Sequence, residues 1–98
     1  MENEKTILSI LIPTIEGRED FYNRLQTELV RQVAKYGLIG KIQILKSKDK
    51  KAEHSIGWKR NLLLQNCDGE YFMFIDDDDM ICEDALPLII NLLNNIKN

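Results

Sequence analysis

Hydrophobic residues in this chain fall into three short continuous runs, separated by longer segments with helical spacing. The first run covers residues 7–12 and is closed by Pro13, the second covers residues 42–45, and the third covers residues 71–75. A near-continuous apolar run is typical of a parallel strand buried on both faces. We therefore predict three buried parallel strands.

The segments between and after these runs carry apolar residues three or four positions apart, which predicts three helices. The first is expected over Glu19–Tyr36, with Gly37 as its C-terminal stop. The second is expected over Ser55–Asn66, with the serine as its cap, and the third begins near Glu83–Asp84, with Pro87 in its first turn.

This alternation of strands and helices predicts the α/β class: a three-layer α/β/α domain, residues 1–98, with a short parallel sheet. Right-handed crossovers predict a parallel sheet with helices on both faces. The expected strand order is 2-1-3, with 1-2-3 as the alternative. In the order 2-1-3 the chain reverses direction beside the first strand, and ligands of open α/β sheets bind at such a point. Residues 13–17 and 76–79 are expected to meet there.

Composition supports a single ordinary globular domain. The chain has 98 residues, of which 44% are hydrophobic and 30% charged, and its net charge of -3 argues against a nucleic-acid-coating surface. Cys67 and Cys82 lack metal-ligand spacing, and no signal peptide or membrane-spanning segment is visible. We therefore expect a cytoplasmic protein with reduced thiols. The basic stretch Lys46–Lys51 is expected to be a solvated loop.

The run of four aspartates, Asp76–Asp79, directly follows the third apolar run. Adjacent carboxylates repel one another unless a cation sits among them. If the extended backbone continues, Asp76 and Asp78 point the same way and form a clamp for Mn²⁺ or Mg²⁺, which prefer oxygen ligands. The alternative is that the aspartates cap the third helix or lie in a solvated loop, and this is what we expect of Asp79.

The second helix offers a candidate anion-binding face near its start. Gly57, Arg60 and Asn61 lie three and four positions apart and so share one face. A glycine lets a ligand approach the backbone, arginine pairs well with phosphate, and a helix N-terminus attracts anions. Lys59 is expected to be turned away from that face by about 100°. The alternative is a solvent-exposed Lys-Arg pair with Asn61 hydrogen-bonded locally.

Taken together, these segments resemble a known family. Residues 8–14, 57–64 and 69–79 are similar, in the same order, to the motifs of family 2-type glycosyltransferases, whose GT-A fold is Rossmann-like. The three pieces cover most of the chain, which then corresponds to the N-terminal nucleotide-sugar-binding portion of such an enzyme.

The resemblance implies a nucleotide-sugar donor, a UDP-sugar first of all, and a Mn²⁺ or Mg²⁺ ion held by the Asp-x-Asp motif. That ion acts as a Lewis acid on the leaving diphosphate. The implied roles are base binding for Pro13, Thr14 and Glu16, contacts near the ribose and diphosphate for Arg60 and Asn61, contact with ribose or metal for Asp76, and metal ligation for Asp78.

The chain departs from the family pattern in two ways. First, family members commonly carry an aspartate after the second strand that recognises the nucleobase, and here only Asp49 could take that role. Second, the chain stops at Asn98, before the acceptor-binding half that supplies the general base for catalysis. We therefore expect a fragment, a subunit that needs a partner or forms a homo-oligomer, or a binding remnant. At most slow donor hydrolysis is expected from this chain alone.

Two other classes of protein fit parts of the pattern. A Toprim-like metal-dependent nucleic-acid domain also places Asp-x-Asp after a late strand, and Glu16, Gly17 and Asp20 resemble its acidic glycine turn. A non-catalytic nucleotide-binding or assembly module, dimerising through the third helix, needs no further half.

Overall fold

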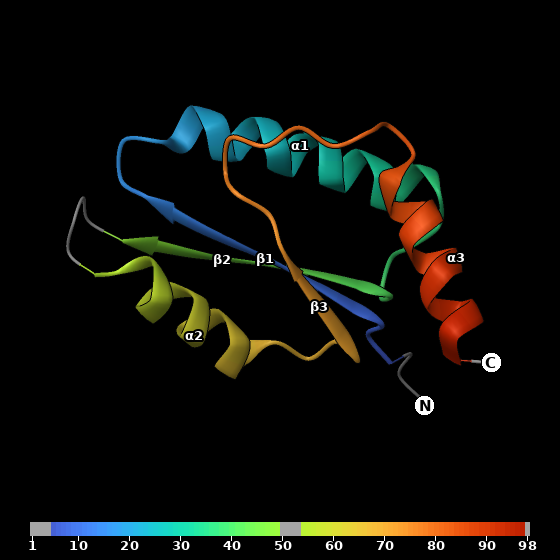
Figure 1. Ribbon diagram of the computed structural model, residues 1–98. Helices are drawn as coiled ribbons and strands as arrows, with labels where there is room; N and C mark the ends of the chain where they lie inside the picture. The colour runs from blue at the N-terminus through green and yellow to red at the C-terminus, as the bar shows by residue number, and fades with distance from the viewer. Residues whose placement is uncertain (1–4, 50–53, 98) are drawn as a thin grey trace.

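A parallel three-stranded sheet lies between helices in this chain (Figure 1). The computed structural model describes residues 5–49 and 54–97. The α/β class and the alternating order of the elements are confirmed. The elements are β1 (Leu8–Ile15), α1 (Glu19–Lys35), β2 (Ile42–Asp49), α2 (Ile56–Asn66), β3 (Tyr71–Phe74) and α3 (Ala85–Lys97).

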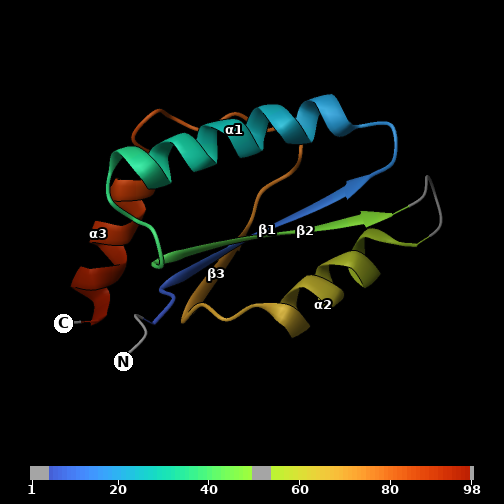
Figure 2. The ribbon, with the colours of Figure 1, turned by 180° about the vertical axis from the view of Figure 1, so that it is seen from behind.

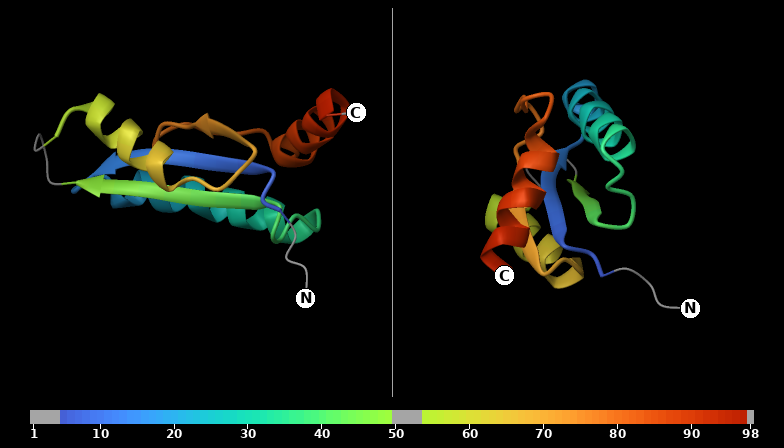
Figure 3. Two further views of the ribbon diagram at one scale, coloured as in Figure 1. Left: turned by 90° about the horizontal axis from the view of Figure 1, so that it is seen from below. Right: turned by 90° about the vertical axis from the view of Figure 1, so that its right-hand side faces the viewer.

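The strand order is β2-β1-β3, which confirms the predicted order 2-1-3 and excludes 1-2-3. β1 pairs with β2 from Leu8↔Ile42 to Ile15↔Asp49, and with β3 from Leu8↔Tyr71 to Leu11↔Phe74. Figures 2 and 3 show α1 and α2 on opposite faces of the sheet, with α3 beside α1. The central strand is therefore covered on every side, which is why its sequence is almost entirely apolar.

β1 continues through Pro13, where the apolar run had suggested an end. Leu11 accepts a hydrogen bond from the Ile75 amide at 3.1 Å, so the backbone groups of Leu11 face β3. Pro13 is two residues further along and faces the same side, beyond the last pair of β1 with β3. Its missing N–H therefore removes no bond from the ladder.

β2 is also longer than predicted, because it follows β1 to its end. The expectation of a solvated loop from Lys46 is wrong for the part up to Asp49, which is strand; Lys50 and Lys51 lie outside the described residues. Lys46 Nζ lies 4.5 Å from the centroid of the Tyr22 ring, and Lys48 Nζ lies 2.8 Å from Glu19 Oε2. Pairing with β1 and contacts with α1 thus stabilise the basic segment as a strand.

α1 packs on the sheet through Tyr22, Leu25 and Leu29, and it ends where the glycine predicts. Gly37 has a φ of 67°, a left-handed conformation that suits glycine. The amide of Leu38 donates to the carbonyl oxygen of Val33 at 2.9 Å, which closes the helix end in the manner of a Schellman motif.

Gln32, which is fully buried, attaches the segment between β3 and α3 to α1. Its Nε2 donates to Cys82 O at 2.7 Å and to Glu28 Oε2 at 2.7 Å, and its Oε1 accepts from the Leu86 amide at 2.9 Å. The first turn of α3 is thereby held by a side chain of α1.

The turn before β3 is fixed against β1 by Ser9, which is also fully buried. Its Oγ donates to Gln43 Oε1 at 2.7 Å and accepts from the Gly69 amide at 2.8 Å. The backbones approach so closely here that a Cβ on Gly69 would lie 2.6 Å from Ser9 N. Only glycine fits this position without movement of the backbone.

α3 buries one side and exposes the other. Leu86 and Ile90 belong to the core, while Leu88, Leu92 and Ile96 are 54%, 62% and 70% exposed. None of the helices in residues 5–49 and 54–97 has both the length and the apolar composition that a bilayer crossing requires.

Candidate functional site

The four aspartates after β3 form a tight turn, and the predicted extended continuation of the strand is wrong. The amide of Asp79 donates to Asp76 O at 3.0 Å, and the amide of Asp76 donates to Asp79 Oδ2 at 3.2 Å. The turn gathers the exposed side chains of Asp76, Asp78 and Asp79, and one carboxylate oxygen of each lies within 4.8 Å of the others. Because Mg²⁺ and Mn²⁺ prefer oxygen ligands, this donor set fits a divalent ion.

Of the two expectations for Asp79, the helix cap is wrong, and the exposed loop position agrees with the structure. α3 begins at Ala85, and the carboxylate of Asp79 accepts from the amide of Asp76 instead. The predicted pair of Asp76 and Asp78 therefore gains a third carboxylate neighbour because the backbone turns back on itself.

Asp77, 6% exposed, is the aspartate of the run that points into the protein. It accepts hydrogen bonds from Thr14 Oγ1 at 2.8 Å, from Arg18 Nε at 2.8 Å and from Arg18 Nη2 at 2.9 Å. Burial raises the pKa of Asp77, but the hydrogen bonds from Arg18 and Thr14 and the charge of Arg18 outweigh it, and the pKa lies below its usual value.

This ionised, fork-like pair ties the acidic turn to the loop after β1. Arg18 Nη2 also lies 3.4 Å from Asp78 Oδ2, and hydrogen bonding to Asp77 is the main reason why the pKa of Arg18 is raised. Neither Arg18 nor Asp77 was among the candidate site residues. Together they decide which aspartates face outward.

A cavity of about 330 Å³ lies at the carboxyl ends of β1 and β3, at the predicted reversal point of the sheet. The end of β1, the beginning of α2 and the acidic turn all contribute to its wall. Of the predicted residues, four come together in this lining: Pro13, Thr14, Asp76 and Asp78. Glu16 is exposed and does not line the cavity, and its amide donates to Asp49 O at 2.7 Å.

α2 presents a different side to this cavity from the one that the sequence suggested. The helix begins at the predicted cap, where the Trp58 amide donates to Ser55 Oγ at 3.1 Å. Ile56 and Lys59 line the cavity, although Lys59 was expected to be turned away. Leu63 is buried one turn further along the helix, so this face is the one that meets the sheet.

The residues of α2 that the sequence predicted for anion binding are exposed and do not line the cavity; they are Gly57, Arg60 and Asn61. The guanidinium of Arg60 lies 5.4 Å from the centroid of the Phe74 ring. Their assignment to a nucleotide stays a prediction. The signal that could have identified Lys59 is its position four residues before an apolar residue that the helix must bury.

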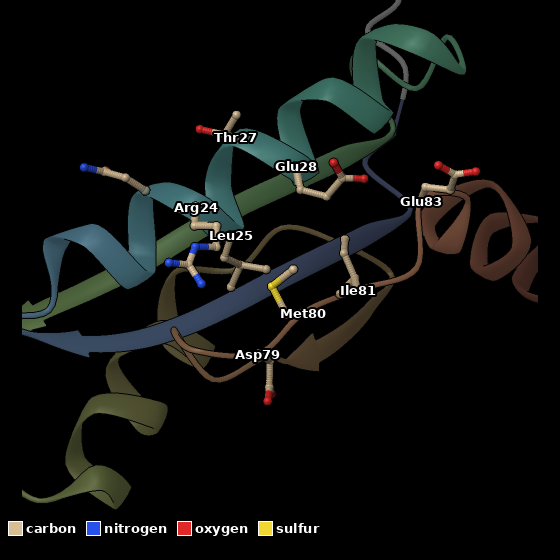
Figure 4. Close-up of a pocket in the computed structure, with 9 residues that line it drawn as sticks. Arg24, Leu25, Thr27, Glu28, Asp79, Met80, Ile81 and Glu83 are labelled. Atoms are coloured by element: carbon tan, nitrogen blue, oxygen red, sulfur yellow. The ribbon is translucent and has the colours of Figure 1, made fainter.

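A second and larger cavity, of about 550 Å³, lies between α1 and the segment that leads to α3 (Figure 4). Leu25 contributes from α1, and Met80 and Ile81 contribute from that segment. Asp79 borders it as well, so the acidic turn separates the two cavities. We place the candidate site in the smaller cavity, because its wall combines carboxylates with a lysine and a helix N-terminus.

The fold and this cavity define an α/β protein with an acidic turn at the reversal point of a parallel sheet. Comparison with profiles of known protein families, with curated proteins and with solved structures finds no match for the chain.

Proposed function

We propose that this chain binds a nucleotide-sugar, a UDP-sugar first of all, as the donor-binding part of a metal-dependent glycosyltransferase. The observation that carries the proposal is the group of three exposed carboxylates, Asp76, Asp78 and Asp79, of which Asp76 and Asp78 line the cavity beside β1. A Mn²⁺ or Mg²⁺ ion bound there supplies positive charge that stabilises the diphosphate leaving group.

The residues of the chain have separate tasks in this proposal. Asp76 and Asp78 line the cavity and hold the ion, and the Arg18–Asp77 pair keeps the turn in place. Pro13 and Thr14 border the nucleotide at the end of β1. The first turn of α2 contains no acidic residue, so no carboxylate of that turn repels a phosphate at its N-terminus.

The test is thermal unfolding with UDP, GDP and their sugars, each with and without Mn²⁺. A ligand at about 100 times its Kd stabilises the native state by about 2.7 kcal/mol, which corresponds to a rise in Tm of about 10–20 °C for a domain of this size. We expect this rise only when Mn²⁺ is present. The variant Asp78→Asn should lose it, whereas Asp20→Asn, an exposed aspartate on α1, should retain it.

Other outcomes would support the rival classes. Nucleotide binding that does not depend on Mn²⁺ would indicate a non-catalytic nucleotide-binding or assembly module. Binding of DNA ends with Mg²⁺, without any response to nucleotides, would indicate the Toprim-like class. If neither nucleotides nor Mn²⁺ change the Tm, the proposal is wrong.

A further inference from the structure

Lys59 is buried to a degree that is unusual for lysine. Only 6% of the residue is exposed, and lysines are almost never so deeply buried unless they are paired. Its backbone amide closes the first turn of α2 by donating to Ser55 O at 3.2 Å. Among the interactions of the described residues, no ion pair and no side-chain hydrogen bond involves its ammonium group.

The ammonium group of Lys59 faces the cavity. No side-chain nitrogen or oxygen that is sealed from solvent lacks a hydrogen-bond partner in the described residues. Because Nζ of Lys59 has no such partner, it must reach solvent, and the cavity is the space that Lys59 lines. An unpaired cation thus points into the same space as Asp76 and Asp78.

The start of α2, beside Lys59, favours an anion, whereas the acidic turn in the wall of the same cavity favours a cation. α2 has 11 residues, begins with a Ser55 cap and has no acidic residue in its first turn, so no carboxylate of that turn compensates the positive end of its dipole.

We propose that Lys59 binds the phosphate groups of a nucleoside diphosphate in this cavity, opposite a divalent ion held by the acidic turn. The proposal rests on the proposed function and assigns the phosphate contact to Lys59 in place of Arg60. Arg60 is exposed and lies against the Phe74 ring, whereas Lys59 lines the cavity. A lysine ammonium carries three donors and binds phosphate as a point charge.

The experiment measures the affinity of the full chain for inorganic phosphate, pyrophosphate and UDP by calorimetry, with Mn²⁺ at constant ionic strength. The variant is Lys59→Met, which keeps an unbranched apolar stem, and the matched control is Arg60→Met on the next residue. We expect Lys59→Met to weaken pyrophosphate and UDP binding about 10- to 100-fold, because it removes a hydrogen bond to a charged group. Arg60→Met should change the affinity for pyrophosphate or UDP by less than about threefold. Lys59→Arg should retain part of the affinity that Lys59→Met loses.

Ligand-free stability separates a binding role from a structural one. Lys59→Met should be at least as stable as the natural protein, because an unpaired buried cation is costly. If Lys59→Met does not fold, Lys59→Gln takes its place in the affinity measurement. A loss of ligand-free stability in a folded variant would show that the ammonium serves the fold, and it would overturn the proposal.

The binding data also separate this proposal from the proposed function. Mn²⁺-dependent UDP binding that Lys59→Met leaves unchanged, or that Arg60→Met weakens equally, overturns the assignment of Lys59 and leaves the function standing. A third outcome is that Lys59→Met abolishes pyrophosphate binding and that UDP binds no more tightly than pyrophosphate. This outcome supports Lys59 as an anion ligand and overturns the nucleotide-sugar function. No binding of any of the three anions overturns both.

Discussion

Replacing Gln32 by methionine removes the hydrogen bonds that attach the beginning of α3 to α1. Methionine has a similar length, so the change deletes polar contacts without leaving a large cavity. It leaves the buried Leu86 amide without its acceptor, at a cost of about 1–3 kcal/mol, and it removes the bonds to Cys82 O and Glu28, worth about 0.5–1.5 kcal/mol each. The expected loss of stability is about 2–6 kcal/mol.

The assay for this prediction is urea unfolding followed by far-UV circular dichroism. A domain of this size has a stability of about 5–15 kcal/mol, so the variant should fold in the absence of urea but unfold at a clearly lower urea concentration with an unchanged m-value. The Leu86 amide should also exchange its hydrogen faster.

The matched control is Gln26→Met, because Gln26 is an exposed residue of the same helix. It should change stability by less than about 0.5 kcal/mol. If Gln32→Met lost less than about 1 kcal/mol, or no more than Gln26→Met, the reasoning that Gln32 anchors α3 would be refuted.

Two further predictions concern close packing and pH. Gly69→Ala should lower the free energy of unfolding in urea by about 1–3 kcal/mol, because its Cβ would lie 2.6 Å from the Ser9 backbone nitrogen. The control Gly57→Ala has open space around its Cβ and should be neutral or stabilising. Equal effects of the two substitutions would refute the predicted clash at Gly69. The Arg18–Asp77 pair lowers the pKa of Asp77 in the folded protein, so its contribution is present above the usual pKa of an aspartate and is lost as the pH falls through the lowered value. Arg18→Met should therefore be less stable than the natural protein at pH 7, and the difference should shrink as the pH falls through the lowered pKa of Asp77. A difference that is independent of pH would contradict this.

The acidic turn shows how a sequence motif can be right in composition and wrong in geometry. The prediction took Asp76 and Asp78 as a pair on an extended backbone. In the structure the backbone turns, Asp79 joins the exposed group, and Asp77 is drawn inward by Thr14 and Arg18. Alternation along a strand cannot predict this, because the inward position is set by an arginine 59 residues earlier in the chain.

The face of α2 gives the same lesson for a helix. The prediction selected the side with the residue types best suited to phosphate, Arg60 and Asn61. A helix, however, is oriented by what it must bury, and in α2 that is Leu63. Lys59 lies on the same face of α2 as Leu63 and is buried with it, whereas Arg60 is exposed.

The sequence by itself determined the class of fold, the order of the elements and the place of the candidate site. Runs of apolar residues, helical spacing, a Ser55 cap and a Gly37 stop are local signals, and the handedness of crossovers converts them into a parallel sheet. The structure then selects the order β2-β1-β3 over 1-2-3. Only the tertiary structure decided how far β2 extends, which aspartates are exposed, that Lys59 and not Arg60 lines the cavity, and that Gln32 anchors α3. Each of these depends on the partner that a residue meets across the fold, and such partners lie far away along the chain, where no local pattern records them.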